Sequence, residues 1–144
     1  LDFITTDHSP APPAIKELQS GNLKKAWGGI AGLQFLLPAS WTAMKEKISI
    51  EKFIPLLTEH PAKFLQVDKK KGKLAVGYDA DLLVWNPEEK LVVREEDVLH
   101  KHKCNPYTGK QLTGTIQQTI INGITVYQNK QIIYKNAGQW LLKK

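Results

Sequence analysis

Residues 1–12 read LDFITTDHSPAP, a short apolar and β-branched run that ends at Asp7 and His8 before a proline-rich loop. We expect residues 1–6 to form a strand buried on both faces, because their apolar side chains do not alternate with polar ones. A carboxylate and an imidazole at the end of such a strand indicate an active site. A lone strand followed by helices has no sheet of its own, and the chain does not begin with Met. We therefore expect it to continue a longer parallel βα array.

Composition is compatible with one ordinary domain, since the chain has 144 residues of which 42% are apolar. The single cysteine, Cys104, excludes a disulfide within the chain and suits a reducing cytoplasm. No apolar run approaches the roughly 20 residues that span a membrane, so we expect no membrane partner. The net charge of +6 favours an anionic partner. Basic and aromatic residues are not interleaved, however, so we expect no nucleic-acid partner. We interpret the basic run Lys69–Lys73 as a solvated turn and Lys143–Lys144 as a tail.

Helical patterns fill the first half after a loop that runs to about Asn22. Apolar residues at helical spacing predict one helix that Pro38 breaks or kinks; these residues are Ile30, Leu33, Leu36 and Leu37. Ser49 is the expected N-cap of a second helix, from Ile50 to about Glu59, with Phe53, Leu56 and Leu57 on its buried face. Pro61 suits the first position of a third, short helix.

Strand patterns fill the second half of the chain, and the change from helical to strand patterns falls near residues 66–74. We expect strands over 81–85 and 91–94, joined by a turn over 86–89. Asn122-Gly123 lies between two β-rich runs and predicts a two-residue hairpin, because both residues tolerate positive φ. A short strand over 131–134 and a terminal helix or frayed end over 138–143 complete the pattern.

Asp7 is the first candidate for chemistry. At a strand end a carboxylate can bind a divalent metal or move a proton, and it can equally cap the following loop. His8 points to the opposite face of an extended chain, so we expect it to pack or to make a supporting hydrogen bond rather than to bind metal.

Other candidates have weaker patterns. Trp27-Gly28-Gly29 would let a ligand approach the backbone, or would serve close packing. His100, His102 and Cys104 form an H-x-H-x-C pattern, but a structural zinc site usually needs four ligands. We expect ordinary packing or surface roles for these three residues and for His60.

Four segments in order resemble the C-terminal part of the allantoinases, a group of cyclic amidohydrolases. They are TTDHSP (5–10), KKAWGGIAGLQFLLP (24–38), HPAKFLQVDKKKGKLAVGYDADLLVWNP (60–87) and NPYTGKQLTGTIQQTIINGITVY (105–127). The third segment is widespread among amidohydrolases, whereas the combination of D-H-S-P with A-W-G-G-I occurs in a narrower group and points towards the allantoinases. Related dihydroorotases have His where this chain has Ala11.

The resemblance implies an α/β fold: the C-terminal part of a metal-dependent (β/α)₈ TIM barrel, with C-terminal strands of a small β-sandwich beside it. On this basis we expect residues 1–66 to form the last βα unit of the barrel. Residues 67–136 would form the sandwich portion, and residues 137–144 a tail.

The resemblance also implies the chemistry. Asp7 would be the catalytic residue and a ligand of a binuclear divalent metal centre, most often zinc, with the other ligands upstream of this chain. Trp27 and Gly28 would bind the substrate ring. A metal-activated hydroxide would open allantoin to allantoate, and Asp7 would shuttle the proton. The chain alone is then expected to be inactive and to hold no metal, and the complete enzyme to be a cytoplasmic homo-oligomer, a tetramer in the family.

Three alternatives remain open. One is a hydantoinase or dihydropyrimidinase, which acts on related rings. Another is a non-catalytic paralogue that keeps the fold as an assembly module. The third is a basic binding domain, which only the charge supports.

Overall fold

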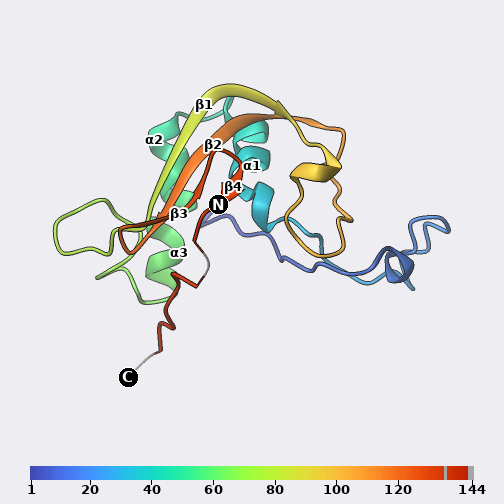
Figure 1. Cartoon of the computed structure of the whole chain (residues 1–144), viewed down its shortest axis with the longest axis horizontal. Helices are drawn as coiled ribbons and strands as arrows, with labels where there is room; N and C mark the ends of the chain where they lie inside the picture. Colours follow the sequence, from blue (N-terminus) through green and yellow to red (C-terminus); the bar gives the residue numbers. More distant parts are fainter. Residues whose placement is uncertain (135, 143–144) are drawn as a thin grey trace.

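The computed structural model of the chain describes residues 1–134 and 136–142, with helices in the first half and an antiparallel sheet in the second (Figure 1). The helices are η1 (Pro13–Lys16), η2 (Leu33–Phe35), α1 (Leu36–Met44), α2 (Ile50–Phe53), η3 (Ile54–Leu56), α3 (Glu59–Phe64) and η4 (Glu95–Asp97). The strands are β1 (Leu82–Val92), β2 (Gln111–Ile121), β3 (Ile124–Gln128) and β4 (Gln131–Ile132). No helix among these residues is long and apolar enough to cross a bilayer.

The sheet has the order β1-β2-β3-β4, and all neighbouring strands are antiparallel. The predicted hairpin is confirmed: Asn122 and Gly123, at φ 49° and 79°, connect β2 to β3, and Ile121 pairs with Ile124. The predicted third strand is present as β4. Residues 138–142 form no helix, and Lys143 and Lys144 lie outside the described residues.

A single strand, β1, replaces the two strands and turn expected over 81–94. β1 stays paired with β2 on both sides of residues 87–89, with Asn86 opposite Thr115 and Lys90 opposite Thr113. Asn-Pro-Glu-Glu is therefore a bulge in one long strand rather than a turn. A bulge absorbs Pro87, which cannot donate to the ladder, without ending the strand.

Trp41 of α1 joins the helices to the sheet. Its ring is 6% exposed and contacts Phe53 and Trp85, at centroid distances of 5.0 and 5.8 Å. Its Nε1–H donates to the carbonyl of Pro87 in the bulge, at 2.9 Å. Gly114 of β2 makes room for the contact between Trp41 and Trp85, because a Cβ at Gly114 would lie 2.9 Å from the Trp85 ring. The bulge and α1 are thus fixed to each other.

A second apolar cluster lies beside it, formed by Phe35, Val93, Val98 and Leu112. The hydroxyl of Thr42 on α1 accepts from the backbone N–H of Thr113 on β2 at 2.7 Å, so helix and sheet are also joined by a hydrogen bond. The division of the chain at residue 66 remains a prediction.

Pro38 does not break its helix, contrary to expectation. α1 begins at Leu36, so Pro38 lies in the first turn, where backbone N–H groups have no intrahelical acceptor and a missing N–H costs little. The buried face also differs, since Pro38 and Trp41 are buried whereas Ile30 and Leu33 are exposed. In the second helical region, the structure places Ser49 at the N-cap and buries Phe53 and Leu56, as predicted, but α2 ends at Phe53 and Leu57 is only half-buried.

Residues 1–6 are not a β-strand in this structure, although the sequence predicts one. A strand needs a neighbour that completes its ladder, and no described strand lies beside this segment. The Ile4 N–H donates instead to the carbonyl of Leu56 at 2.9 Å. The segment is extended chain rather than a buried strand, with Phe3 and Ile4 half-buried.

Lys71 is not a solvated lysine of a turn, because it forms ion pairs with Asp79, at 2.9 Å, and with Asp81. Partial burial alone would lower the pKa of Lys71, but the hydrogen bonds that its ammonium group donates to the two carboxylates outweigh it and raise this pKa. Burial opposes the charge on Asp81 too, and Lys71 and the backbone N–H of Asn122 still hold the Asp81 pKa below its usual value. The basic loop is therefore anchored to the hairpin turn.

Trp41→Phe should lower the free energy of unfolding of the 144-residue chain by about 2 kcal/mol, since it leaves a cavity and deprives the half-buried Pro87 carbonyl of its donor. Urea denaturation followed by circular dichroism measures this difference. Trp140→Phe is the matched control, because Trp140 is 91% exposed. Equal losses in the two variants would contradict the role assigned to Trp41.

Candidate active-site edge

Asp7 lies at the end of the extended N-terminal segment, in the left-handed region at φ 46°. Its exposed carboxylate lies against Gly29: a Cβ built on Gly29 would be 3.3 Å from Asp7 Oδ2, 3.0 Å from the Asp7 carbonyl oxygen and 2.6 Å from Ser9 Cβ. Gly29 itself has φ +69°. Any side chain at this position would clash with the segment that carries Asp7.

A short parallel pairing brings these two segments together. His8 forms a parallel bridge with Ile30, and the Ser9 N–H donates to the Ile30 carbonyl at 2.8 Å. The indole Nε1–H of Trp27 donates to Ser9 Oγ, also at 2.8 Å. Residues 7–9 and 27–30 therefore form one edge, which we call the Asp7 edge.

Trp27 and Gly28, the predicted substrate-binding residues, lie on this edge and are exposed. Their carbonyl oxygens each lie 3.2 Å from the Nζ of Lys16, and the Gly29 carbonyl lies 2.7 Å from it. These carbonyls accept from the ammonium group. Of the two glycines, Gly29 makes the close approach to Asp7, whereas a Cβ on Gly28 would meet nothing within 4 Å.

His8 lies on the same edge and is exposed. Its Nδ1 accepts from the Leu33 N–H at 3.2 Å, and its ring lies edge-on to His100 with centroids 6.3 Å apart. A ring nitrogen that accepts a hydrogen bond carries no proton, which places the proton of neutral His8 on Nε2. The sequence predicts packing or a supporting hydrogen bond for His8, and the hydrogen bond seen is to Leu33 rather than to Asp7.

His100 is half-buried behind His8, and its Nδ1 is buried without a hydrogen-bond partner among the described residues. Burial, followed by the charges of His8, Lys103 and His102, lowers the pKa of His100. The Asn105 amide lies 3.5 Å from His100 Nε2 and donates to the Ala31 carbonyl at 2.9 Å. The hydrogen bond from Asn105 to Ala31 ties the chain just after the Asp7 edge to the loop that follows β1.

The described residues include no cluster of three or more His, Cys, Asp or Glu side chains placed to hold a metal ion. His60 lies away from the H-x-H-x-C segment, with its Nδ1 2.6 Å from the Asp2 carbonyl oxygen. Asp7 offers one carboxylate, the ligand type that divalent metals accept, but such ions take four or more ligands. The described part of the chain therefore places no such cluster around Asp7.

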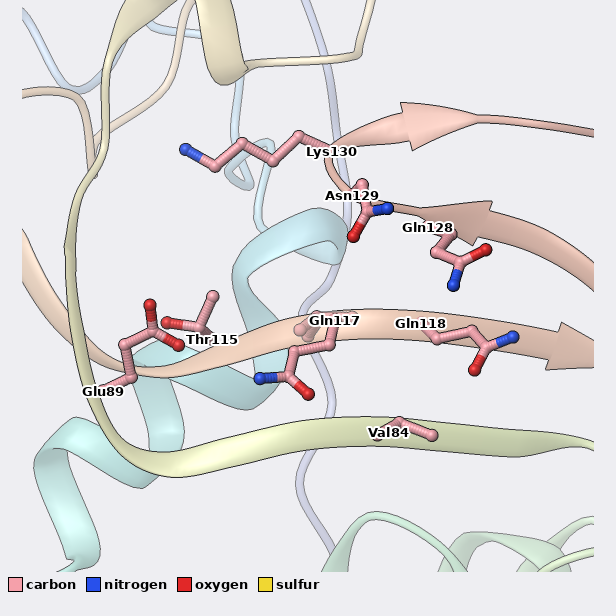
Figure 2. A pocket seen from close by; sticks show the side chains of 9 residues that line it. Val84, Glu89, Thr115, Gln117, Gln118, Gln128, Asn129 and Lys130 are labelled. Carbon is pink, nitrogen blue, oxygen red and sulfur yellow. The ribbon is translucent and has the colours of Figure 1, made fainter.

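A separate hollow of about 350 Å³ lies on the sheet (Figure 2). Polar side chains of β2, β3 and the turn before β4 line much of it, among them Gln117, Gln118, Gln128 and Asn129. It contains no residue of the Asp7 edge and no histidine or cysteine, so it adds nothing to the chemistry of that edge.

The sequence predicts roles for Asp7, Trp27 and Gly28 and a supporting contact for His8, and the structure places all four on the Asp7 edge; Lys16 and Ser9, which also contact this edge, were not predicted. Lys16 reaches carbonyls 11 to 13 positions away across an irregular loop, and no periodic pattern marks such a contact. Ser9 stands inside the quoted D-H-S-P motif, so the motif was the available signal.

Solved hydantoinases have the same fold as this chain. The L-hydantoinase (dihydropyrimidinase) from Arthrobacter aurescens superposes with a TM-score of 0.84 and 30% identity, over 95% of this chain and 31% of that chain. The D-hydantoinase from Thermus sp. gives a TM-score of 0.81 at 22% identity, over 95% of this chain and 30% of that one, and supports the fold alone. These neighbours are TIM-barrel enzymes, so the expected fold class, part of an α/β barrel, is confirmed.

Curated relatives include a probable allantoinase from Oryza sativa subsp. japonica, 37% identical over 147 residues, which is 100% of this chain and 29% of the relative. The allantoinase from Desulfitobacterium hafniense is 33% identical over 98% of this chain and 31% of its own length. The chain therefore spans about three tenths of the length of these relatives.

A family model points the same way as these relatives. The model of the amidohydrolase family matches residues 10–127, well over half of the chain and both of its structural halves. This chain belongs to the amidohydrolase family.

Proposed function

We propose that this chain is the C-terminal part of a metal-dependent cyclic amidohydrolase that hydrolyses allantoin to allantoate. The observation that carries the proposal is the Asp7 edge, where an exposed carboxylate lies against Gly29, next to Trp27 and Gly28 in the chain. The allantoinases among its relatives, 33–37% identical over 98–100% of the chain in rice and Desulfitobacterium hafniense, support allantoin as the substrate.

Asp7 is the proposed catalytic residue. Amidohydrolases are metal-dependent in general, and a divalent metal supplies Lewis-acid activation of water and of the ring carbonyl when bound. We assign Asp7 as one ligand of a binuclear zinc centre whose other ligands come from outside this chain. In the reaction the Asp7 carboxylate takes a proton from the attacking water and delivers it to the departing ring nitrogen.

Trp27 and Gly28 are the proposed substrate-binding residues. They lie on the same edge as Asp7, and both residues are exposed. Backbone groups there are held in place at Ser9 and Lys16, so a planar ring can be bound in one orientation relative to the carboxylate.

A hydantoinase or dihydropyrimidinase activity is the second candidate, because the L-hydantoinase from Arthrobacter aurescens is 30% identical with a TM-score of 0.84. A non-catalytic paralogue would lack the metal ligands upstream.

We also propose that the complete enzyme is a cytoplasmic homo-oligomer. Residues 1–144 alone neither bind the metals tightly nor catalyse, because one carboxylate is too few ligands.

The full-length protein that contains this chain should hydrolyse allantoin with a kcat/KM at least about tenfold above that for hydantoin or dihydrouracil. Steady-state assays with the three rings, with chelated and zinc-restored enzyme as the metal control, measure this preference. A preference for hydantoin or dihydrouracil would favour the second candidate. Hydrolysis of none of the three rings would contradict a catalytic role.

Asp7→Asn in the full-length enzyme should lower kcat by about 10³-fold, because an amide cannot accept the proton of water. Asp2→Asn is the matched control, since Asp2 is an exposed carboxylate of the same segment whose backbone carbonyl, not its side chain, contacts His60. A kcat for Asp7→Asn within threefold of the wild type would rule out proton transfer by Asp7, with metal content measured in parallel.

A further inference from the structure

Lys16 has an unusual environment for a lysine near the surface. It is the last residue of η1, and its ammonium group lies 2.7–3.2 Å from three successive carbonyl oxygens, those of Trp27, Gly28 and Gly29. Within the part of the chain that the structure describes, Lys16 forms no ion pair with a carboxylate. Its charge is satisfied by the backbone of the Asp7 edge itself.

This contact fixes the direction of the peptide groups. A trans peptide is planar, with its C=O and the next N–H pointing to opposite sides. Because the carbonyls of Trp27 and Gly28 face Lys16, the N–H groups of Gly28 and Gly29 point away from it. Neither N–H has a hydrogen-bond partner among the described residues, and the space beside Gly28 is open.

Successive N–H groups on one side of the chain form a concavity that suits an oxygen with partial negative charge. The positive charge of Lys16 behind the same peptides adds to this preference. A ring carbonyl oxygen of a cyclic amide has the matching chemistry, and Gly29 lies against Asp7.

We propose that Lys16 is a positioning residue, which holds the carbonyls of residues 27–29 on one side so that the N–H groups of Gly28 and Gly29 bind a carbonyl oxygen of the substrate ring. The inference rests on the proposed function, because it assumes a cyclic amide bound at the Asp7 edge. Lys16 acts through the backbone and does not touch the reacting bond.

The test uses full-length enzyme and whichever of the three rings (allantoin, hydantoin or dihydrouracil) the wild type hydrolyses. Lys16→Met keeps the length of the side chain and removes its donors, so we expect KM to rise about tenfold while kcat changes less than about threefold. Lys16→Arg retains several donors and should restore KM to within about threefold of the wild type. Lys24→Met, at a nearby exposed lysine, is the control and should leave both constants unchanged.

Melting temperature and metal content, measured on the same samples, separate positioning from folding. An unchanged KM in Lys16→Met would overturn the inference. A loss of activity that follows only a lower melting temperature or metal content, again at unchanged KM, would also overturn it. Wild-type enzyme that hydrolyses none of the rings would instead contradict the proposed function, so the two failures are distinguishable.

Discussion

The Asp7 edge depends on one close approach, in which His8 pairs in parallel with Ile30 and the Ser9 N–H donates to the Ile30 carbonyl. The approach is possible because Gly29 has no side chain, and a Cβ there would lie 2.6 Å from Ser9. It places the Asp7 carboxylate beside the backbone that we assign to substrate binding. A carboxylate that we assign to proton transfer must be held within hydrogen-bond reach of the reacting group, and this pairing holds the segment that carries Asp7.

The sheet holds this edge in place through contacts far apart in the sequence. Asn105 donates to the Ala31 carbonyl, and the amide of Gln34 bonds the backbone of both Asp97 and Leu99. These bonds tie residues 31–34, just after the edge, to the loops that follow β1. Trp41 fixes α1 to the bulge in β1, so the helices cannot shift along the sheet independently. The sheet thus serves the site as a rigid support.

Features coded by neighbouring residues were predictable from the sequence. Asn122-Gly123 specifies its hairpin locally, and the D-H-S-P and A-W-G-G-I motifs identified both halves of the Asp7 edge. Features that depend on distant partners were not. The bulge at residues 86–89 resembles a turn until β2 pairs across it, and Pro38 is harmless only because α1 begins at Leu36. Residues 1–6 have strand character but no described neighbour to pair with, and the Lys16 contact has no periodic signature.

The most direct test of the central claim is the distance from the Asp7 carboxylate to the nearest metal in a crystal structure of the zinc-loaded full-length protein, located by anomalous scattering. We expect one Asp7 oxygen to coordinate the metal at about 2.0–2.2 Å, the usual range for carboxylate and zinc. A fully loaded metal centre with both Asp7 oxygens beyond about 4 Å, outside any coordination distance, would contradict it.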